Sequence, residues 1–496
     1  MSNSFGYFLI LAYSAILLIL VLGIKNRYRH EKETILTYIL AGKEIPAWLL
    51  TTSVFSAWIW VTTIIGSAEA TVLYGLTGAV GYSVGASVSF LVFIMIILTM
   101  QRMMPESTSF LEFVGERYSK TVKDLYYIFA ILTTVYVAIE QAAGISFVLN
   151  GFFDTSYKKV AFLSVFIAIV YVVLTGMRGV LYNEFISFFF ITVGFVIFVM
   201  TAFQNFSFTE MKEGLLNAQN NPLNANYNPD VLNLASLTGL RYSVMAVVIA
   251  FGQILFDPAY YIKASLAKNQ REAKKAFLLG GIILWCPVGI VSAVTLGFLS
   301  IAKEIDFSDS LNISADIPTK LITQFLGEPM ALWFSFFIIC IGITTILHYL
   351  IGIQAIFTID FYKNKIKPEA AEKDKIKFGK VIVILVGTFC GLIAISLEDI
   401  SLLTIDMFCG VFFAAPCGAL FAAIISKKEF KNLPVLSIFL GLCTGFYVWV
   451  FFIEDHNWAW FWGTMASFFI PMIFLFLCSF LIKNEYNFTR MRFWRP

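Results

Sequence analysis

Charged residues are scarce in this sequence, and their scarcity excludes a soluble domain. They make up 14% of the 496 residues, and hydrophobic residues make up 59%, whereas a soluble domain contains about 25% charged residues. The apolar residues form runs of roughly twenty, the length that an α-helix needs to cross a bilayer core. These runs are continuous rather than alternating, which disfavours a membrane β-barrel. We therefore expect an all-α protein embedded in a lipid bilayer.

Patterns of metal-binding and disulfide-forming residues are also missing. The seven cysteines all lie inside apolar runs without CxxC spacing, which disfavours a zinc site or a disulfide framework. The three histidines, His30, His348 and His456, are scattered along the chain. No nucleophile–base pattern indicates an enzyme, and we expect neither an organic cofactor nor a nucleic-acid partner. The first apolar run, 5–24, has no preceding basic segment and no cleavage site, so it is interpreted as a helix rather than a signal peptide.

The apolar runs predict about thirteen transmembrane helices. We place them at 5–24, 46–74, 79–100, 124–150, 159–175, 180–203, 239–262, 276–302, 330–361, 381–397, 401–425, 433–453 and 460–482. With the N-terminus outside, 29 of the 35 Lys and Arg residues lie in segments that face the cytoplasm, as the positive-inside rule requires. We therefore expect a multi-pass protein of the cell membrane with a cytoplasmic C-terminus. The tail after Ile482 is short, so no appended signalling domain is expected.

Two of the predicted helices look interrupted. The second, 46–74, is dense in Ser and Thr and contains Gly66 and Glu69, which favours a broken helix that lines a cavity. Broken backbone is tolerated at membrane depth only where protein or a cavity covers it, and its freed carbonyls suit Na⁺. The seventh, 239–262, contains Asp257-Pro258, and proline removes a backbone donor there.

These two helices open consecutive blocks of five. Because five is odd, the second block is inverted in the membrane relative to the first. Interrupted helices in corresponding positions of inverted repeats indicate a transport site near the midplane. The predicted organisation is an N-terminal helix and cytoplasmic loop (1–45), a first repeat (46–203), an external loop that has room for a short helix (204–238), a second repeat (239–425), and two C-terminal helices with a cytoplasmic tail (426–496).

Ionisable residues inside membrane helices are costly and usually functional. The candidates are Glu69, Glu140, Glu184, Asp257 and Asp406. Glu140 lies in mid-helix beside Gln141. For Glu184, close to a cytoplasmic helix end, and for Asp406, close to a helix start, a solvated or capping carboxylate is an equal alternative.

Three motifs, each a loose match, occur in an order and at a spacing typical of one transporter family. They are Tyr38-Ile-Leu-Ala-Gly-Lys-Glu-Ile-Pro-Ala-Trp, Thr175-Gly-Met-Arg-Gly-Val-Leu-Tyr-Asn-Glu and Thr358-Ile-Asp-Phe-Tyr-Lys. Together they resemble the solute:sodium symporter family over roughly 5–425. Ser56-Ala-Trp-Ile-Trp and Phe256-Asp-Pro-Ala-Tyr-Tyr look closest to its urea-transporter-like branch. The resemblance implies a LeuT-like 5+5 inverted repeat with one extra N-terminal and two extra C-terminal helices.

The resemblance also implies a sodium site, aligned through Ser56-Ala57. Its ligands would be backbone oxygens of Thr52, Phe55 and Ile341 and side-chain hydroxyls of Thr344 and Thr345. The two threonines are adjacent on a helix and point about 100° apart, so one ion must lie between them. Glu184 falls where many members have Asp, which suggests a second cation or proton site.

The expected function is secondary active transport. A small polar solute, with urea-like compounds as one option, would be symported with Na⁺ by alternating access. The expected solute contacts are Trp58, Trp60, Glu69, Glu140, Gln141 and Asp257. Two alternatives stay open: a proton-coupled symporter with Glu69, Glu140 or Glu184 as carrier, and a sensor or receptor built on a transporter fold.

Overall fold

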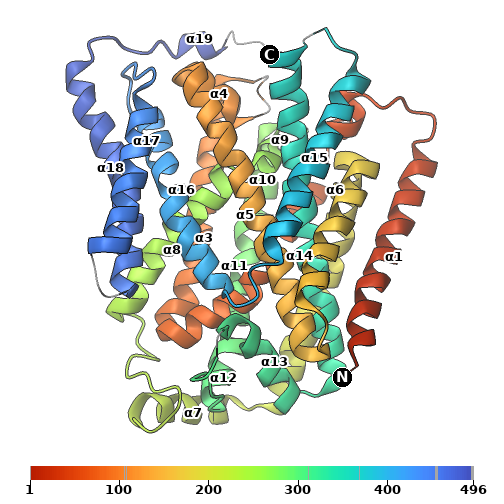
Figure 1. Ribbon diagram of the computed structural model, residues 1–496, viewed down its shortest axis with the longest axis vertical. Coiled ribbons are helices and arrows are strands. Elements are labelled where there is room, and N and C mark those ends of the chain that lie inside the picture. The colour runs from red at the N-terminus through yellow and green to blue at the C-terminus, as the bar shows by residue number, and fades with distance from the viewer. Residues whose placement is uncertain are drawn as a thin grey trace.

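A computed structural model describes residues 2–105, 107, 109–310, 312–367, 369–452 and 456–492. These residues form helices and no strands. The long helices run along the long axis of the molecule, and α1 begins at the end opposite to α19 (Figure 1). The last positions of the predicted cytoplasmic tail, 493–496, lie outside the described residues.

The helices of the first half of the chain are α1 (Asn3–Arg27), η1 (Ile35–Ile39), α2 (Ala47–Trp58), η2 (Thr62–Gly66), α3 (Ser67–Met103), α4 (Phe110–Arg117), α5 (Lys120–Phe153), α6 (Tyr157–Asn205), α7 (Phe208–Asn220), α8 (Leu237–Leu255) and α9 (Pro258–Leu266). Those of the second half are α10 (Gln270–Leu278), η3 (Leu279–Ile283), α11 (Trp285–Ser292), η4 (Ala293–Phe298), α12 (Leu299–Ala302), α13 (Ile313–Phe325), α14 (Glu328–Ile356), η5 (Phe357–Ile366), α15 (Glu372–Ala394), α16 (Leu402–Ile425), α17 (Leu433–Tyr447), η6 (Val448–Phe452), α18 (His456–Leu481) and α19 (Thr489–Arg492). The elements labelled η are short, wide helical turns.

The prediction of an all-α multi-pass membrane protein is confirmed. Eleven helical stretches among the described residues are long and apolar enough to cross a membrane. Two of them, Thr62–Met103 and Tyr157–Asn205, have 42 and 49 residues and would measure about 63 and 74 Å if straight. Each leaves the helical conformation at one glycine, Gly75 or Gly176. The eleven stretches give thirteen crossings if both of these cross twice, and that count stays a prediction.

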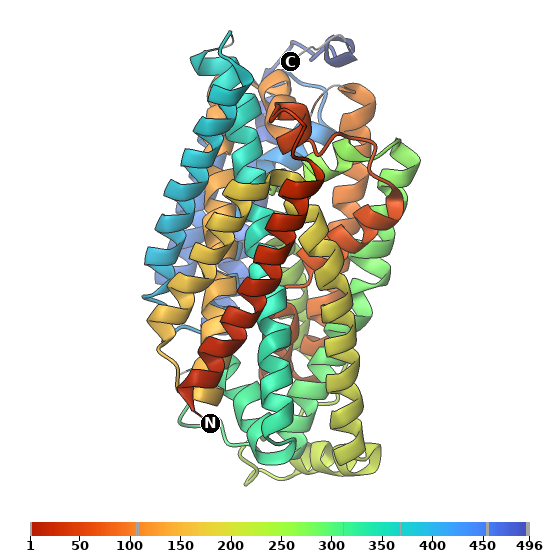
Figure 2. The same cartoon turned by 90° about the vertical axis from the view of Figure 1, so that its right-hand side faces the viewer.

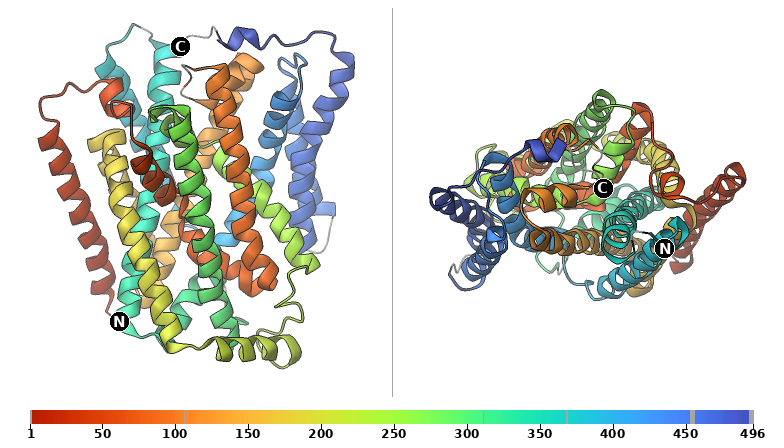
Figure 3. Two further views of the ribbon diagram at one scale, coloured as in Figure 1. Left: turned by 180° about the vertical axis from the view of Figure 1, so that it is seen from behind. Right: turned by 90° about the horizontal axis from the view of Figure 1, so that it is seen from above.

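Helix α14 forms the centre of the molecule. Every residue from Phe337 to Ile356 is buried, and the helix packs against α2, α5, α6 and α9. An apolar helix without a polar face is expected in such a position. In contrast, α1 and the α17–α18 pair lie at opposite edges when the molecule is viewed along its axis (Figure 3). Figure 2 looks directly onto α1, which carries exposed apolar side chains such as Phe8 and Ile19.

Both predicted helix interruptions are present. Helix α2 ends at Trp58, Ile59 is extended, and the helix resumes in η2. The break therefore lies before Gly66, which is itself helical. Helix α8 ends at Leu255, and α9 begins at Pro258 with Asp257 as its N-cap. Proline suits the first helical position because the amide hydrogen that it lacks would have no partner there.

The predicted external loop contains the short helix α7. Its start is stabilised by a capping box, in which Ser207 and Glu210 pair with each other's backbone amides. Such reciprocal bonds satisfy two amides that a helix N-terminus otherwise leaves unpaired.

The backbone at Gly176 gives a test of the fold. Its φ is +62°, and a Cβ added there would lie 2.5 Å from the backbone oxygen of Tyr38. Gly176→Ala is therefore expected to destabilise the protein by about 1–3 kcal/mol, seen as a lower thermal unfolding midpoint in detergent. Gly23 on α1 is the control, because no atom lies within 4 Å of its added Cβ and alanine favours a helix. Equal midpoints for the two variants would contradict the assigned backbone.

Candidate functional site

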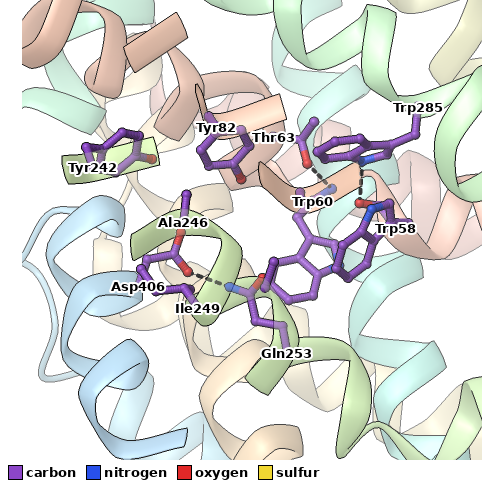
Figure 4. Close-up of a pocket in the computed structure, with 12 residues that line it drawn as sticks. Trp58, Trp60, Thr63, Tyr82, Tyr242, Ala246, Ile249, Gln253, Trp285 and Asp406 are labelled. Carbon is purple, nitrogen blue, oxygen red and sulfur yellow. Dashed lines mark hydrogen bonds between the residues drawn. The ribbon is translucent and has the colours of Figure 1, made fainter. Parts of the chain in front are cut away.

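A cavity lies beside the first helix break and reaches Gln253, one turn before the second (Figure 4). Its free volume is about 20 Å³, room for roughly one water molecule, so the cavity is nearly closed in this structure. Its lining residues are Trp58, Trp60, Thr63, Tyr82, Ala86, Tyr242, Ala246, Ile249, Ala250, Gln253, Trp285 and Asp406. They come from α2, the break that follows it, η2, α3, α8, α11 and α16.

Three tryptophans form one wall of this cavity. The rings of Trp58 and Trp60 meet edge to face with centroids 5.4 Å apart. Trp285 Nε1 donates to the backbone oxygen of Trp58 at 2.7 Å. The amide of Trp60 donates to Thr63 Oγ1 at 3.0 Å. Side chains thus pair backbone groups that the break leaves without helical partners, as burial in a membrane requires.

Gln141 completes this support from α5. Its Oε1 accepts a hydrogen bond of 2.8 Å from the amide of Val61, just before η2 resumes the helix. The expected solute contact at Gln141 is therefore a contact to the broken backbone in this structure.

The opposite wall is polar. Gln253 Nε2 donates to Asp406 Oδ1 at 2.8 Å and to the Tyr136 hydroxyl at 2.7 Å, and Tyr136 donates to Asp406 Oδ1. Glu140 adjoins Asp406, and all four side chains are buried. Asp406 is thus neither solvated nor a cap, and α16 is capped by Ser401 instead. The wall presents carboxyl, amide and hydroxyl groups to a small occupant.

The expected solute contacts are only partly together. Trp58 and Trp60 line the cavity, and Glu140 adjoins its polar wall. Glu69 does not line it, because its carboxylate accepts from the Ser314 hydroxyl and from the amide of Leu403 at 3.3 Å. Glu69 therefore accepts a hydrogen bond from a backbone amide at the start of α16, where helix amides lack helical partners.

Asp257 belongs to a second cluster, in which four ionisable side chains are fully buried. Lys263 Nζ lies 2.6 Å from Glu184 Oε1 and 2.7 Å from His348 Nδ1. His348 Nε2 lies 2.7 Å from Asp257 Oδ2. The Ser53 hydroxyl donates to Glu184 Oε2 at 2.5 Å. We call Glu184, Lys263, His348 and Asp257 the buried tetrad.

Sequence reasoning missed half of the buried tetrad. Lys263 was counted with a cytoplasmic loop, but it lies inside α9 and is buried, so that assignment was wrong. Glu184 is not solvated either. The available signal was the proline at Pro258: a helix that restarts there carries Lys263 into its second turn. Another signal was the spacing of His348, one turn after Thr344.

The two threonines expected to bind sodium face different neighbours. Thr345 Oγ1 donates to the backbone oxygen of Ile59, in the break, at 3.3 Å. Phe55 offers a backbone oxygen there that already accepts from Ile59 at 2.9 Å. Thr52 lies on the same helix, and Ile341 is buried one turn before Thr345.

Thr344 faces away from the break. Its hydroxyl lies 2.8 Å from Ser187 Oγ, 3.0 Å from Asn183 Nδ2 and 3.2 Å from the Tyr13 hydroxyl. These partners belong to α6 and α1. The two threonines are therefore adjacent on α14, but their hydroxyls contact different neighbours.

Paired helix breaks beside a small, partly polar cavity are the architecture of a secondary active transporter. The model of the sodium:solute symporter family matches residues 38–431. This chain belongs to that family, whose members are transporters and not enzymes, and the resemblance found in the sequence is confirmed.

Similar proteins include urea transporters. The chain is 23% identical to a probable urea active transporter 1 of Schizosaccharomyces pombe, over 99% of this chain and 78% of that protein. It is 21% identical to the urea-proton symporter DUR3 of Oryza sativa subsp. japonica, over 80% of this chain and 58% of that protein. A solved Na⁺-coupled sialic acid symporter, in a substrate-bound outward-open state, has the same fold with a TM-score of 0.71. It is 17% identical, and the match covers 95% of this chain and 98% of that one.

The bond from Trp285 to the first break is testable. Trp285→Phe leaves the backbone oxygen of Trp58 without that donor, which costs about 1–3 kcal/mol when the group is buried. We expect a lower thermal midpoint and slower solute uptake. The control is Trp333→Phe, which removes a 3.3 Å bond to the oxygen of Gly194 within the helical span of α6 and should leave uptake unchanged. Equal uptake by both variants would contradict the role of Trp285.

Proposed function

We propose that this protein symports urea or a related small amide. The observation that carries the proposal is the cavity with a tryptophan wall facing Gln253 and Asp406, which are both bonded to Tyr136. Urea is flat, has N–H donors on two sides and one carbonyl acceptor. Carboxyl oxygens suit its donors, and tryptophan faces suit its plane. The similarity to urea transporters supports the same choice.

The proposed mechanism is alternating access by two inverted five-helix repeats, 46–203 and 239–425, within thirteen membrane crossings. The turns at Gly75 and Gly176 and the opposite ends reached by α1 and α19 support this layout. The charge distribution supports an N-terminus outside the cell. The first and second repeat would rock around the cavity and expose it to each side in turn.

Sodium is the coupling ion that we propose from the sequence, with Thr52, Phe55, Ile341, Thr344 and Thr345 as ligands. The family membership supports it, and so does the contact of Thr345 with the broken backbone. A bound ion drives transport only if it binds one conformation more tightly than the other. A site between α2 and α14 meets that condition when α2 moves.

The polar wall can be tested with Gln253→Leu. The variant removes, at similar volume, the amide that donates to Asp406 and Tyr136. A polar wall weakened by about one net hydrogen bond of 1–1.5 kcal/mol should raise the KM for urea roughly fivefold to tenfold. The measurement is radiolabelled urea uptake into proteoliposomes over a range of concentrations. Gln219→Leu, on α7 outside the cavity, is the matched control. An unchanged KM in Gln253→Leu would contradict the assigned site, and urea binding without flux would favour the sensor alternative.

The sodium site can be tested with the double variant Thr344→Ala, Thr345→Ala. If both hydroxyls bind the ion, the stimulation of urea uptake by Na⁺ should fall by about tenfold or more, since each tenfold is 1.4 kcal/mol. The control double variant is Thr99→Ala, Thr444→Ala, in which both hydroxyls bond their own helices. Retained Na⁺ stimulation in the first variant would show that these ligands are wrong.

A further inference from the structure

We propose that the buried tetrad of Glu184, Lys263, His348 and Asp257 is a proton-binding site that couples a proton to solute movement. This inference rests on the proposed function as a symporter and adds an ion and a site to it. It comes from the geometry and the charge count of the tetrad.

The four groups form one unbroken chain of polar contacts. It runs from Glu184 to Lys263 at 2.6 Å, on to His348 at 2.7 Å, and from the far side of the imidazole to Asp257 at 2.7 Å. His348 Nδ1 also lies 3.3 Å from Glu184 Oε1. All four side chains of the tetrad are 0% exposed. A proton entering at one group can therefore be redistributed to the others through hydrogen bonds.

The ion pair with Glu184 at 2.6 Å favours the ammonium form of Lys263. An ammonium group has no lone pair, so Lys263 Nζ then donates to His348 Nδ1, and that nitrogen carries no hydrogen. The single N–H of the neutral imidazole is then on Nε2 and donates to Asp257. Two carboxylates, one ammonium and a neutral imidazole together carry one net negative charge.

A net charge buried at membrane depth is unfavourable, and one added monovalent cation removes it. The positions that a metal ion would occupy are filled. Lys263 Nζ covers Glu184 Oε1, Ser53 covers Glu184 Oε2, and the amide of Ala259 donates to Asp257 Oδ1 at 2.8 Å. A proton needs no such space, so it is the cation that this site suits.

Other titratable groups near the tetrad do not supply the missing charge. They are the tyrosines Tyr171 on α6, Tyr260 and Tyr261 on α9, and Tyr349 on α14. From α2 the tetrad is faced by Ser53, whose hydroxyl does not titrate in this range. Tyrosine is neutral near pH 7, so the charge of the tetrad depends on its own four members.

The tetrad also bridges parts that alternating access would move apart. Glu184, on α6, belongs to the first repeat, whereas Asp257, Lys263 on α9 and His348 on α14 belong to the second. Ser53 and Ser56 tie α2 to Glu184 through its carboxylate and its backbone oxygen, at 2.5 and 2.8 Å. A proton that neutralises one acceptor changes the bonds that cross between these helices. It therefore favours one packing over the other, as coupling requires.

The test uses wild-type protein in proteoliposomes, with urea as the probe and the membrane potential held at zero. With Na⁺ replaced by choline, an outside pH one unit lower should accumulate urea about tenfold for one proton per solute. His348→Gln should lose this accumulation but keep urea counterflow, which needs binding and movement but no gradient. His30→Gln, at an exposed histidine, should keep both. Accumulation that ignores the pH gradient, or a His348→Gln variant that accumulates like wild type, would overturn the proposal.

A second measurement needs no solute and separates this proposal from the proposed function. If wild type shows no urea counterflow, the urea proposal fails, and the tetrad is tested by thermal unfolding in choline chloride. The midpoint of wild type should rise as the pH falls from 8 to 6, because the added proton neutralises the tetrad. Glu184→Gln removes the net charge permanently and should flatten that slope, whereas Glu213→Gln, exposed on α7, should not. Parallel slopes for the two variants would overturn the proton site.

Discussion

The structure depends on one constraint: backbone amides and carbonyls that leave a helix inside a membrane must find other partners. The first break opens at Ile59 and Trp60, and its groups are paired by Trp285, Gln141 and Thr63. Thr63 lies in η2 directly after the break, whereas Trp285 and Gln141 come from α11 and α5, so satisfying the break fixes where two distant helices meet it. The cavity is the space that remains between them, and its tryptophan wall is part of the same support.

The second break meets the constraint differently. Asp257 caps α9 with its carboxylate, and this places a carboxylate in the fully buried interior of the protein. That buried carboxylate needs a further partner, which is His348. His348 contacts Lys263, and Lys263 in turn pairs with Glu184. Neutral side chains thus hold the first break in one state. Ionisable side chains hold the second, which makes its contacts sensitive to the number of bound protons.

Local patterns predicted what depends on local chemistry. Apolar runs gave the helical class, and Asp257-Pro258 located the second break to the residue. Side-chain contacts between helices were harder to predict, because periodicity does not say which helix covers a given side chain. Glu69 was expected to contact the solute, but its carboxylate accepts a hydrogen bond from the amide of Leu403 at the start of α16. Lys263 fell in a loop because the predicted seventh helix, 239–262, ended one residue before it. A buried lysine is rare, and its ion pair with Glu184, on another helix, makes this burial tolerable.

The two proposed sites have a direct physical connection through adjacent residues of α14. His348 bonds Asp257 in the second break, and Tyr349 donates to the backbone oxygen of Gln253 at 3.2 Å, one turn earlier. Tyr349 also packs on the ring of Trp60, with centroids 5.9 Å apart. A change in the bond between His348 and Asp257 therefore acts on the same hinge that carries Gln253 into the cavity wall. Coupling between a proton and a solute needs no long pathway here, since both bear on the short segment from Gln253 to Asp257.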